Sequence, residues 1–198
     1  MSARRLHHEQ PASFAYSAES KARVDREITK YPPGRQASAV IALLWIGQEQ
    51  EGWVTKPMIE AIASLLGMAY IRVLEVATFY TMFNLSPVGK FYVQLCGTTP
   101  CVLRGADELK KVCRKMIGDQ DHVTNDGLFS WTEVECLGAC VNAPMVQINY
   151  DYYEDLTADS FSRILNDMSV GKTPKPGPQV DRLNSAPIGG QTTLLDKA

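Results

Sequence analysis

The sequence of 198 residues has no cysteine before position 96, and its longest uncharged stretches are too short to cross a membrane. These stretches, residues 36–48 and 76–89, fall short of the roughly 20 apolar residues that a transmembrane helix requires. Lys and Arg number 20 against 22 Asp and Glu, a net charge of −2. Proteins that bind nucleic acid usually carry a basic excess or a basic stripe. We therefore expect no membrane insertion and no nucleic-acid partner.

Motifs for nucleotide binding and for secretion are also missing. No G-x-G-x-x-G follows a predicted strand and no Walker A loop occurs, so we expect no nucleotide site in this chain. Arg4 and Arg5 lie near the N-terminus, but no apolar stretch follows them as in a secretory signal. The early acidic residues Glu9 and Glu19 disfavour an organelle presequence. The sequence is typical of a reducing compartment, where thiols stay reduced.

The first half of the chain has the periodicity of helices. Ser17 and Thr55 are suitable N-caps, and Gly67 is a suitable stop signal. The pattern predicts helices over 18–30, 36–50, 56–66 and 71–83. The last of these is apolar on nearly every side, so either the core of the bundle or another subunit must cover it. We favour the core.

From residue 87 the pattern changes to short extended runs alternating with helices. It predicts strands over 91–95, 129–135, 145–148 and 152–154, and helices over 108–117 and 158–168. The helix between the first two strands permits a parallel βαβ crossover, whereas the final hairpin needs an antiparallel pair, so the sheet should be mixed. We predict an α+β protein with four parts: a flexible N-terminus (1–16), a helical bundle for docking (17–86), a domain with a small mixed sheet (87–170) and an extended Pro/Gly-rich tail (171–198).

All five cysteines lie between positions 96 and 140, and four of them form two pairs. The pairs are Cys96-x4-Cys101 and Cys136-x3-Cys140, and each directly follows a predicted strand. If those two strands lie side by side, their carboxyl ends bring all four sulfurs to one edge of the sheet. Glycines flank the pairs, Gly97 among them, and allow backbone amides to approach the sulfurs closely, as a negatively charged metal–sulfur centre requires.

Four thiolates in one place favour zinc or an iron–sulfur cluster, because soft sulfur ligands select these metals. Structural zinc commonly has C-x2-C spacing, whereas the wider x4 and x3 loops suit the broader [2Fe–2S] cluster. The spacing therefore favours [2Fe–2S] over zinc, with redox-active or structural thiols as further alternatives. A Rieske centre needs two histidine ligands, and the three histidines of the sequence lie away from the cysteines.

The fifth cysteine, Cys113, lies apart from the two pairs in the predicted helix 108–117. It shares a helix face with Leu109, Val112 and Met116, while four basic residues take the opposite face. We predict that Cys113 is a small core residue and that the basic face is solvated rather than a docking patch.

The segments around the cysteine pairs resemble the two cluster loops of the 24-kDa subunit of respiratory NADH:quinone oxidoreductase (complex I). They read VQLCGTTPC at 93–101 and VECLGACVNAP at 134–144. EVATFYTMF at 75–83, YPPGRQ at 31–36 and KPGPQ at 175–179 are also similar to that family's pattern. The resemblance thus extends over almost the whole chain from about Arg5.

This resemblance implies a thioredoxin-like ferredoxin domain with one [2Fe–2S] cluster on Cys96, Cys101, Cys136 and Cys140, preceded by a helical bundle that helps to dock the protein. It also implies a partner, the flavoprotein subunit of the 51-kDa type that binds NADH and FMN, and further subunits of the peripheral arm. A hydride would reach the flavin on that partner, and the cluster in this chain would accept one electron. No catalytic residue and no NADH or FMN site is expected in this chain itself.

The sequence and the resemblance together predict an electron-transfer subunit of an NADH dehydrogenase module. We expect it on the cytoplasmic side of a bacterial inner membrane, with the mitochondrial matrix side as the alternative. Two other functions stay open. The equivalent subunit of a soluble NAD-linked hydrogenase or formate dehydrogenase shares the cysteine pattern, and a zinc-stabilised interaction module would use the same thiols without redox chemistry.

Overall fold

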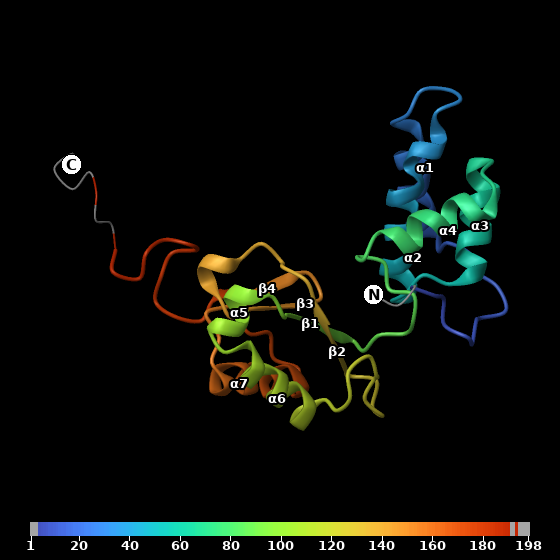
Figure 1. Ribbon diagram of the computed structural model, residues 1–198. Coiled ribbons are helices and arrows are strands. Elements are labelled where there is room, and N and C mark those ends of the chain that lie inside the picture. The colour runs from blue at the N-terminus through green and yellow to red at the C-terminus, as the bar shows by residue number, and fades with distance from the viewer. Residues whose placement is uncertain (1–3, 191–192, 194–198) are drawn as a thin grey trace. The chain divides into compact units, whose positions relative to one another are not determined.

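The computed structural model describes residues 4–190 and residue 193. The chain divides into two compact units, Met1–Pro87 and Val88–Ala198. The first unit is helical and the second is built around a sheet (Figure 1). No helix within the described part of the chain is long and apolar enough to cross a membrane.

Capped helices form the first unit. They are α1 (Ala18–Thr29), the short 3-10 helix η1 (Gln36–Ala39), α2 (Val40–Glu51), α3 (Lys56–Leu66) and α4 (Tyr70–Phe79). The predicted N-caps are confirmed, because the side chain of Ser17 accepts from the amide of Ser20 and that of Thr55 from the amide of Met58. Gly67 ends α3 in the left-handed region, at φ 62°, which a glycine adopts without strain.

Helix α4 is shorter than the predicted helix 71–83. It ends at Phe79, and Tyr80 already has an extended backbone with ψ 116°. The guanidinium of Arg4 donates to the carbonyls of Thr78 at 3.1 Å and Tyr80 at 2.8 Å, and also to that of Phe83. A charged side chain from the N-terminal segment thus binds carbonyls that a longer helix would have paired internally.

The two sides of α4 differ in burial. Val73 and Ala77 are completely buried in the bundle, whereas the side chains of Ile71 and Phe79 are 53% and 77% exposed. The preferred prediction, that this apolar helix belongs to the core, is confirmed for one side only. The opposite side presents apolar surface that this unit does not cover.

The described part of the N-terminal segment, residues 4–16, contacts the bundle along its length. The amide of His7 donates to the carbonyl of Leu85 at 2.8 Å, and the Tyr16 hydroxyl donates to the carbonyl of Leu43 at 2.8 Å. The sequence predicts a flexible segment here, since it lacks periodicity, but its partners lie far away in the sequence. Residues 1–3 of that predicted segment lie outside the described residues.

The described strands of the second unit form one mixed sheet of five strands. They are β1 (Phe91–Cys96), β2 (Phe129–Val134), β3 (Val146–Ile148), β4 (Asp151–Glu154) and β5 (Gly177–Pro178), in the order β2-β1-β3-β4-β5. β1 runs parallel to β2 and antiparallel to β3, and β3 and β4 form the predicted hairpin. The predicted mixed sheet, with a crossover between its first two strands, is therefore confirmed.

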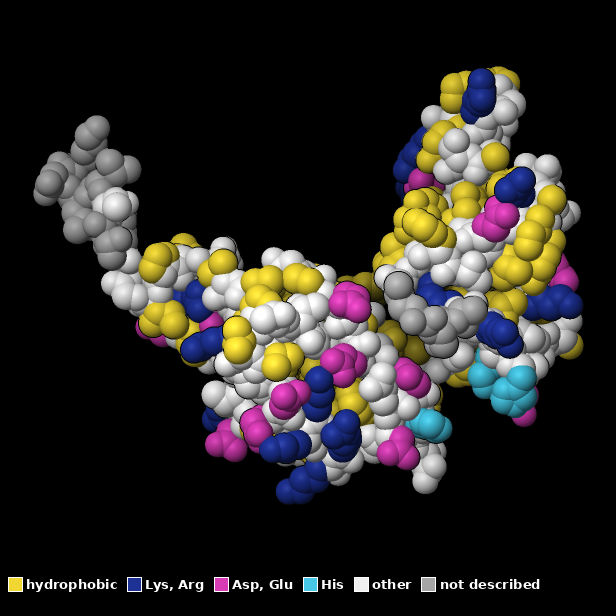
Figure 2. Space-filling view, viewed as in Figure 1, with side chains coloured by type: hydrophobic (Ala, Val, Ile, Leu, Met, Phe, Trp, Pro, Cys, Tyr) yellow, Lys and Arg dark blue, Asp and Glu magenta, His cyan; other side chains and the backbone are white. Residues whose placement is uncertain are grey.

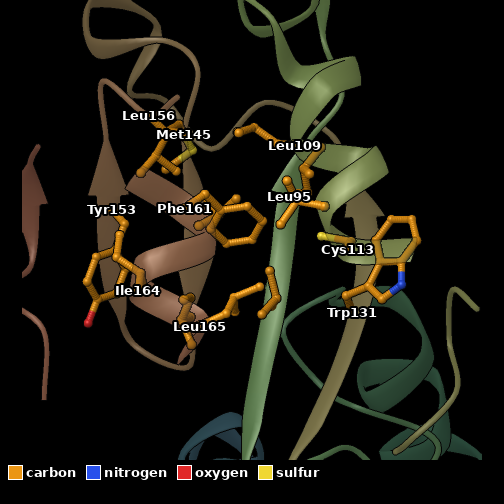
Figure 3. Close-up of a cluster of buried hydrophobic side chains, with 14 of the residues drawn as sticks. Leu95, Leu109, Cys113, Trp131, Met145, Tyr153, Leu156, Phe161, Ile164 and Leu165 are labelled. Atoms are coloured by element: carbon orange, nitrogen blue, oxygen red, sulfur yellow. The ribbon is translucent and has the colours of Figure 1, made fainter. Parts of the chain in front are cut away.

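Helices α6 (Ala106–Met116) and α7 (Ala158–Ser169) lie side by side and cover one face of this sheet (Figure 1). Figure 3 shows Phe161 of α7 pointing toward Leu95 of β1, with Cys113 of α6 beside Trp131. Cys113 is fully buried, which confirms the prediction that it is a core residue. Its burial raises the pKa of the thiol to about 12.

The charged face of α6 carries ion pairs. Lys110 Nζ lies 3.2 Å from Asp107 Oδ1, and Lys111 Nζ lies 2.7 Å from Glu108 Oε1. Figure 2 shows basic and acidic side chains interspersed over this part of the surface. The predicted solvated face is confirmed to this extent, since its lysines are paired with acids on the same helix.

The tail after α7 is not simply extended. Its strand β5 pairs in parallel with β4, and the amide of Gln179 donates to the carbonyl of Glu154 at 2.9 Å. Further along, Arg182 forms an ion pair with Asp155. Residues 191–192 and 194–198 of the predicted tail lie outside the described residues.

Candidate metal centre

Each cysteine pair begins where one of the two parallel strands ends. Cys96 is the last residue of β1 and stands in register with Val134, the last residue of β2. Cys136 follows β2 after one intervening residue, and Cys140 begins the 3-10 helix η2 (Cys140–Asn142). Because β1 and β2 are neighbours and parallel, the two cysteine segments share one sheet edge.

The position of Cys101 differs from the prediction. The sequence predicts a loop there, but Cys101 lies in a short helix, α5 (Thr99–Leu103), with Pro100 in the first turn. A helix of five residues is too short to show periodicity. Proline near the start of a helix was the available signal, since its fixed φ suits the first turn and its missing N–H needs no partner there.

The four sulfurs form two pairs that differ in exposure. Cys136 Sγ lies 3.4 Å from Cys140 Sγ, and both residues are exposed. The thiols of Cys96 and Cys101 are hydrogen-bonded to each other, and both side chains are only 1% exposed. The pairs are close enough for negative charge at Cys140 to raise the pKa of Cys101.

Hydrogen bonds favour the thiolate form of Cys96. Burial acts to raise its pKa, but the side chain and the backbone amide of Thr98, the thiol of Cys101 and the backbone amide of Leu137 outweigh burial and lower the pKa. Thr98 Oγ1 lies 3.4 Å from Cys96 Sγ. Leu137 belongs to the other cysteine segment, so its amide joins the two segments at the sulfur.

The neighbouring thiols respond in the opposite direction. Burial and the hydrogen bond to Cys96 raise the pKa of Cys101 to about 12, although the backbone amide of Met145 acts to lower it. The hydrogen bond to Cys136, and then burial, raise the pKa of Cys140. Four thiolates this close repel one another, so a complete set of four thiolates requires cationic metal between them.

The donor set fits a two-iron cluster. A [2Fe–2S] cluster is held by four cysteine thiolates, two to each iron, and the sulfurs here form two pairs. Within the part of the chain that the structure describes, no group of three or more His, Cys, Asp or Glu side chains is arranged to hold a single metal ion. The amide of Gly138 adds a donor at 3.4 Å from Cys136 Sγ.

A chain with this sheet and these cysteine pairs has the features of an iron–sulfur electron carrier. The chain belongs to the family of thioredoxin-like [2Fe–2S] ferredoxins, whose family model matches residues 24–169. A subunit of the NADH-quinone oxidoreductase of Rhizobium meliloti (strain 1021) is 57% identical, over 98% of this chain and 73% of the relative. The subunit with the same designation in the enzyme of Rickettsia bellii (strain RML369-C) is 51% identical, over 78% of this chain and 93% of the relative.

The fold is also similar to part of a larger solved structure. An NAD+-reducing [NiFe]-hydrogenase, in its H2-reduced state, matches 68% of this chain with a TM-score of 0.59 at 14% identity. This chain spans only 23% of that hydrogenase chain. At this identity the likeness concerns the fold alone. The α+β fold class and the family resemblance expected from the sequence are confirmed.

Several residues around the sulfurs were not predicted from the sequence. Thr98 is one of them, and the amides of Leu137 and Met145 are others, because a backbone donor leaves no mark on residue type. Asn142 is a fourth, a buried polar side chain two residues after Cys140. A polar residue next to a cysteine was the only signal for it.

Proposed function

We propose that this chain is the electron-transfer subunit of the NADH dehydrogenase module of an NADH:quinone oxidoreductase, and that Cys96, Cys101, Cys136 and Cys140 hold one [2Fe–2S] cluster. The observation that carries the proposal is the meeting of four sulfurs at the carboxyl edge of β1 and β2. Support comes from the 57% identity to a subunit of an NADH-quinone oxidoreductase.

A [2Fe–2S] cluster supplies one-electron chemistry when bound. The residues of this chain set its surroundings. Cys96 and Cys101 place one side of the site in the buried interior, and donors from Thr98, Leu137 and Gly138 stabilise negative charge on sulfur. Hydrogen bonds to sulfur and solvent exposure are the means by which a protein tunes the reduction potential of such a centre.

The exposed side of the site is where an electron donor can approach. Cys136 and Cys140 are both exposed, and Val141 beside them is 68% exposed. We place NADH and FMN on a partner flavoprotein, because the sequence contains no nucleotide-binding motif. In this proposal Cys136 and Cys140 face the flavin-bearing partner, and neighbouring subunits of the peripheral arm hold the chain on the cytoplasmic side of the bacterial inner membrane.

Anaerobic purification of the full chain tests the cluster. We expect a red-brown protein whose visible absorption bleaches with dithionite and whose reduced form gives a rhombic electron paramagnetic resonance (EPR) signal. Single replacement by serine of Cys96, Cys101, Cys136 or Cys140 should impair iron retention, whereas the control Cys113→Ala should keep it. A colourless protein with zinc and no iron would refute the redox function and favour the zinc-stabilised module.

A second candidate function is the equivalent subunit of a soluble NAD-linked hydrogenase or formate dehydrogenase. The shared fold with an NAD+-reducing hydrogenase favours it. Affinity purification of the tagged chain from its own organism separates the two. Recovery with quinone-reductase subunits supports the first function, and recovery with hydrogenase or formate dehydrogenase subunits supports the second.

A further inference from the structure

Arg182 lies in the tail beyond β5, yet its side chain is buried. It is 7% exposed, as is the side chain of Asp155, and Arg182 Nη2 lies 2.6 Å from Asp155 Oδ1. Its other terminal nitrogen, Nη1, donates to Asn142 Oδ1 at 3.0 Å. One tail residue therefore joins the turn after β4 to the segment that follows Cys140.

Asn142 is held at every polar atom of its side chain. Nδ2 donates to Glu154 Oε2 at 2.6 Å and to the carbonyl of Asn184 at 3.0 Å, while Oδ1 accepts from Arg182. Its backbone carbonyl accepts from the amide of Asp155 at 2.7 Å. With 3% of its surface exposed, Asn142 has one fixed position, and two tail residues contribute to holding it.

The position of Asn142 determines that of Cys140. Both belong to η2, in which the amide of Asn142 donates to the carbonyl of Ala139 at 3.0 Å and that of Ala143 to the carbonyl of Cys140 at 3.3 Å. Cys140 itself is exposed, unlike the two cysteines buried at the end of β1 and in α5. Its sulfur therefore depends on the tight turn that Asn142 anchors.

Stability alone is a weak reason for this ion pair. Apolar packing of similar volume often stabilises a protein as well as a buried ion pair does. Here Asp155 Oδ2 and Arg182 Nε are also buried without a hydrogen-bond partner among the described residues. What the pair does provide is direction, because it aims the second nitrogen of the Arg182 fork at Asn142.

We propose that Arg182 is a positioning residue for the sulfur of Cys140, and that tail residues 179–186 act as a clamp that retains the cluster. The inference rests on the proposed function, since it takes Cys140 as a ligand. Residues that orient metal ligands without touching the metal typically change metal affinity by about 10- to 100-fold when they are replaced.

Cluster release from the full chain tests the clamp. After anaerobic reconstitution with iron and sulfide, the loss of visible absorption is followed in excess iron chelator. We expect Arg182→Met to release iron at least about tenfold faster than the wild-type chain and to shift its EPR g-values. Arg182→Lys should lie in between, because it keeps the charge and loses the fork.

Lys172→Met is the matched control. Lys172 Nζ lies 2.9 Å from Asp167 Oδ1 in an exposed ion pair of the same unit. Its replacement by the same residue type removes an ion pair far from Asn142 in the sequence. An exposed pair contributes little, so the release rate and the g-values should stay at the wild-type values.

Two further variants cover the case in which Arg182→Met does not fold. Arg182→Met combined with Asp155→Asn removes both buried charges, and asparagine tolerates the φ of 53° at position 155. Asn142→Ala keeps the ion pair and cuts its link to the turn. Both should release iron about tenfold faster. Both apoproteins should show faster hydrogen exchange at the amide of Ala143 with an unchanged far-UV circular dichroism spectrum.

Two contrary outcomes are distinct. If these folded variants keep wild-type release rates, g-values and hydrogen exchange, Arg182 has no positioning role even though the cluster is present. If the wild-type chain itself binds no iron after reconstitution, the proposed function fails, and the clamp for its cluster fails with it.

Discussion

The carboxylate of Glu133 lies directly over Gly97, where a β-carbon at position 97 would overlap Glu133 Oε1. The same oxygen lies 2.9 Å from Lys110 Nζ, and this hydrogen bond raises the pKa of Lys110. A strand, a helix and the residue after Cys96 thus meet at one carboxylate. Glycine at position 97 leaves room for it beside the first cysteine segment.

Gly97→Ala should therefore displace Glu133 from Lys110. We expect the free energy of unfolding of the apoprotein to fall by about 0.5–1 kcal/mol, the worth of a partly exposed ion pair. Urea unfolding measures this loss. In a Glu133→Ala background the same substitution should cost much less, because the overlap is gone. Equal losses in both backgrounds would show that the contact between Glu133 and position 97 is unimportant.

Thiol labelling should follow exposure in the apoprotein. Cys136 and Cys140 are exposed, whereas Cys96, Cys101 and Cys113 are buried. With iodoacetamide and peptide mass spectrometry, we expect the exposed pair to react at least about tenfold faster than the buried three. After cluster reconstitution the exposed pair should be protected as well. Rapid labelling of Cys101 in the folded apoprotein would contradict the buried position of α5.

Cys113 should make the apoprotein less stable at high pH. Its pKa is about 12 in the folded chain, against an ordinary value of 9.0. Because the folded pKa is the higher one, the unfolded thiol ionises first. The stabilising contribution is complete below pH 9 and is lost as the pH rises from 9 toward 12, by at most about 1.4 kcal/mol per pH unit.

Comparison with Cys113→Ala isolates this effect from other groups that titrate at high pH. In urea unfolding at pH 8, 9, 10 and 11, the wild-type chain should lose stability relative to the variant above pH 9. A stability difference that does not change with pH would mean that Cys113 is not buried in the folded chain.

Arg4→Met should weaken the end of α4. The guanidinium of Arg4 donates to the carbonyls of Thr78, Tyr80 and Phe83 beyond or near the last helical turn. Hydrogen bonds from a charged donor and the favourable charge at a helix C-terminus predict a loss of about 1–2 kcal/mol in unfolding free energy. Hydrogen exchange should speed up at residues 76–83, while Arg5→Met serves as the neighbouring control.

Local signals in the sequence predicted most of the elements. Ser17, Thr55 and Thr157 each accept a hydrogen bond from the backbone of the helix that follows them. Capping depends on residues three apart, so the sequence pattern contains it. The α4 boundary failed for the opposite reason. It depends on Arg4, which is 74 positions away from Thr78.

The sequence by itself determined the cysteine spacing, the helical first half and the mixed sheet, because these depend on periodicity, on caps and on residue types close together in the chain. Only the tertiary structure decided which groups surround the sulfurs. The amide of Leu137 at Cys96 and the carboxylate of Glu133 over Gly97 arise because parallel β1 and β2 end side by side. The same holds for the tail, where Arg182 reaches Asn142 across 40 positions. Such contacts are set by packing between distant segments, about which a local pattern carries no information.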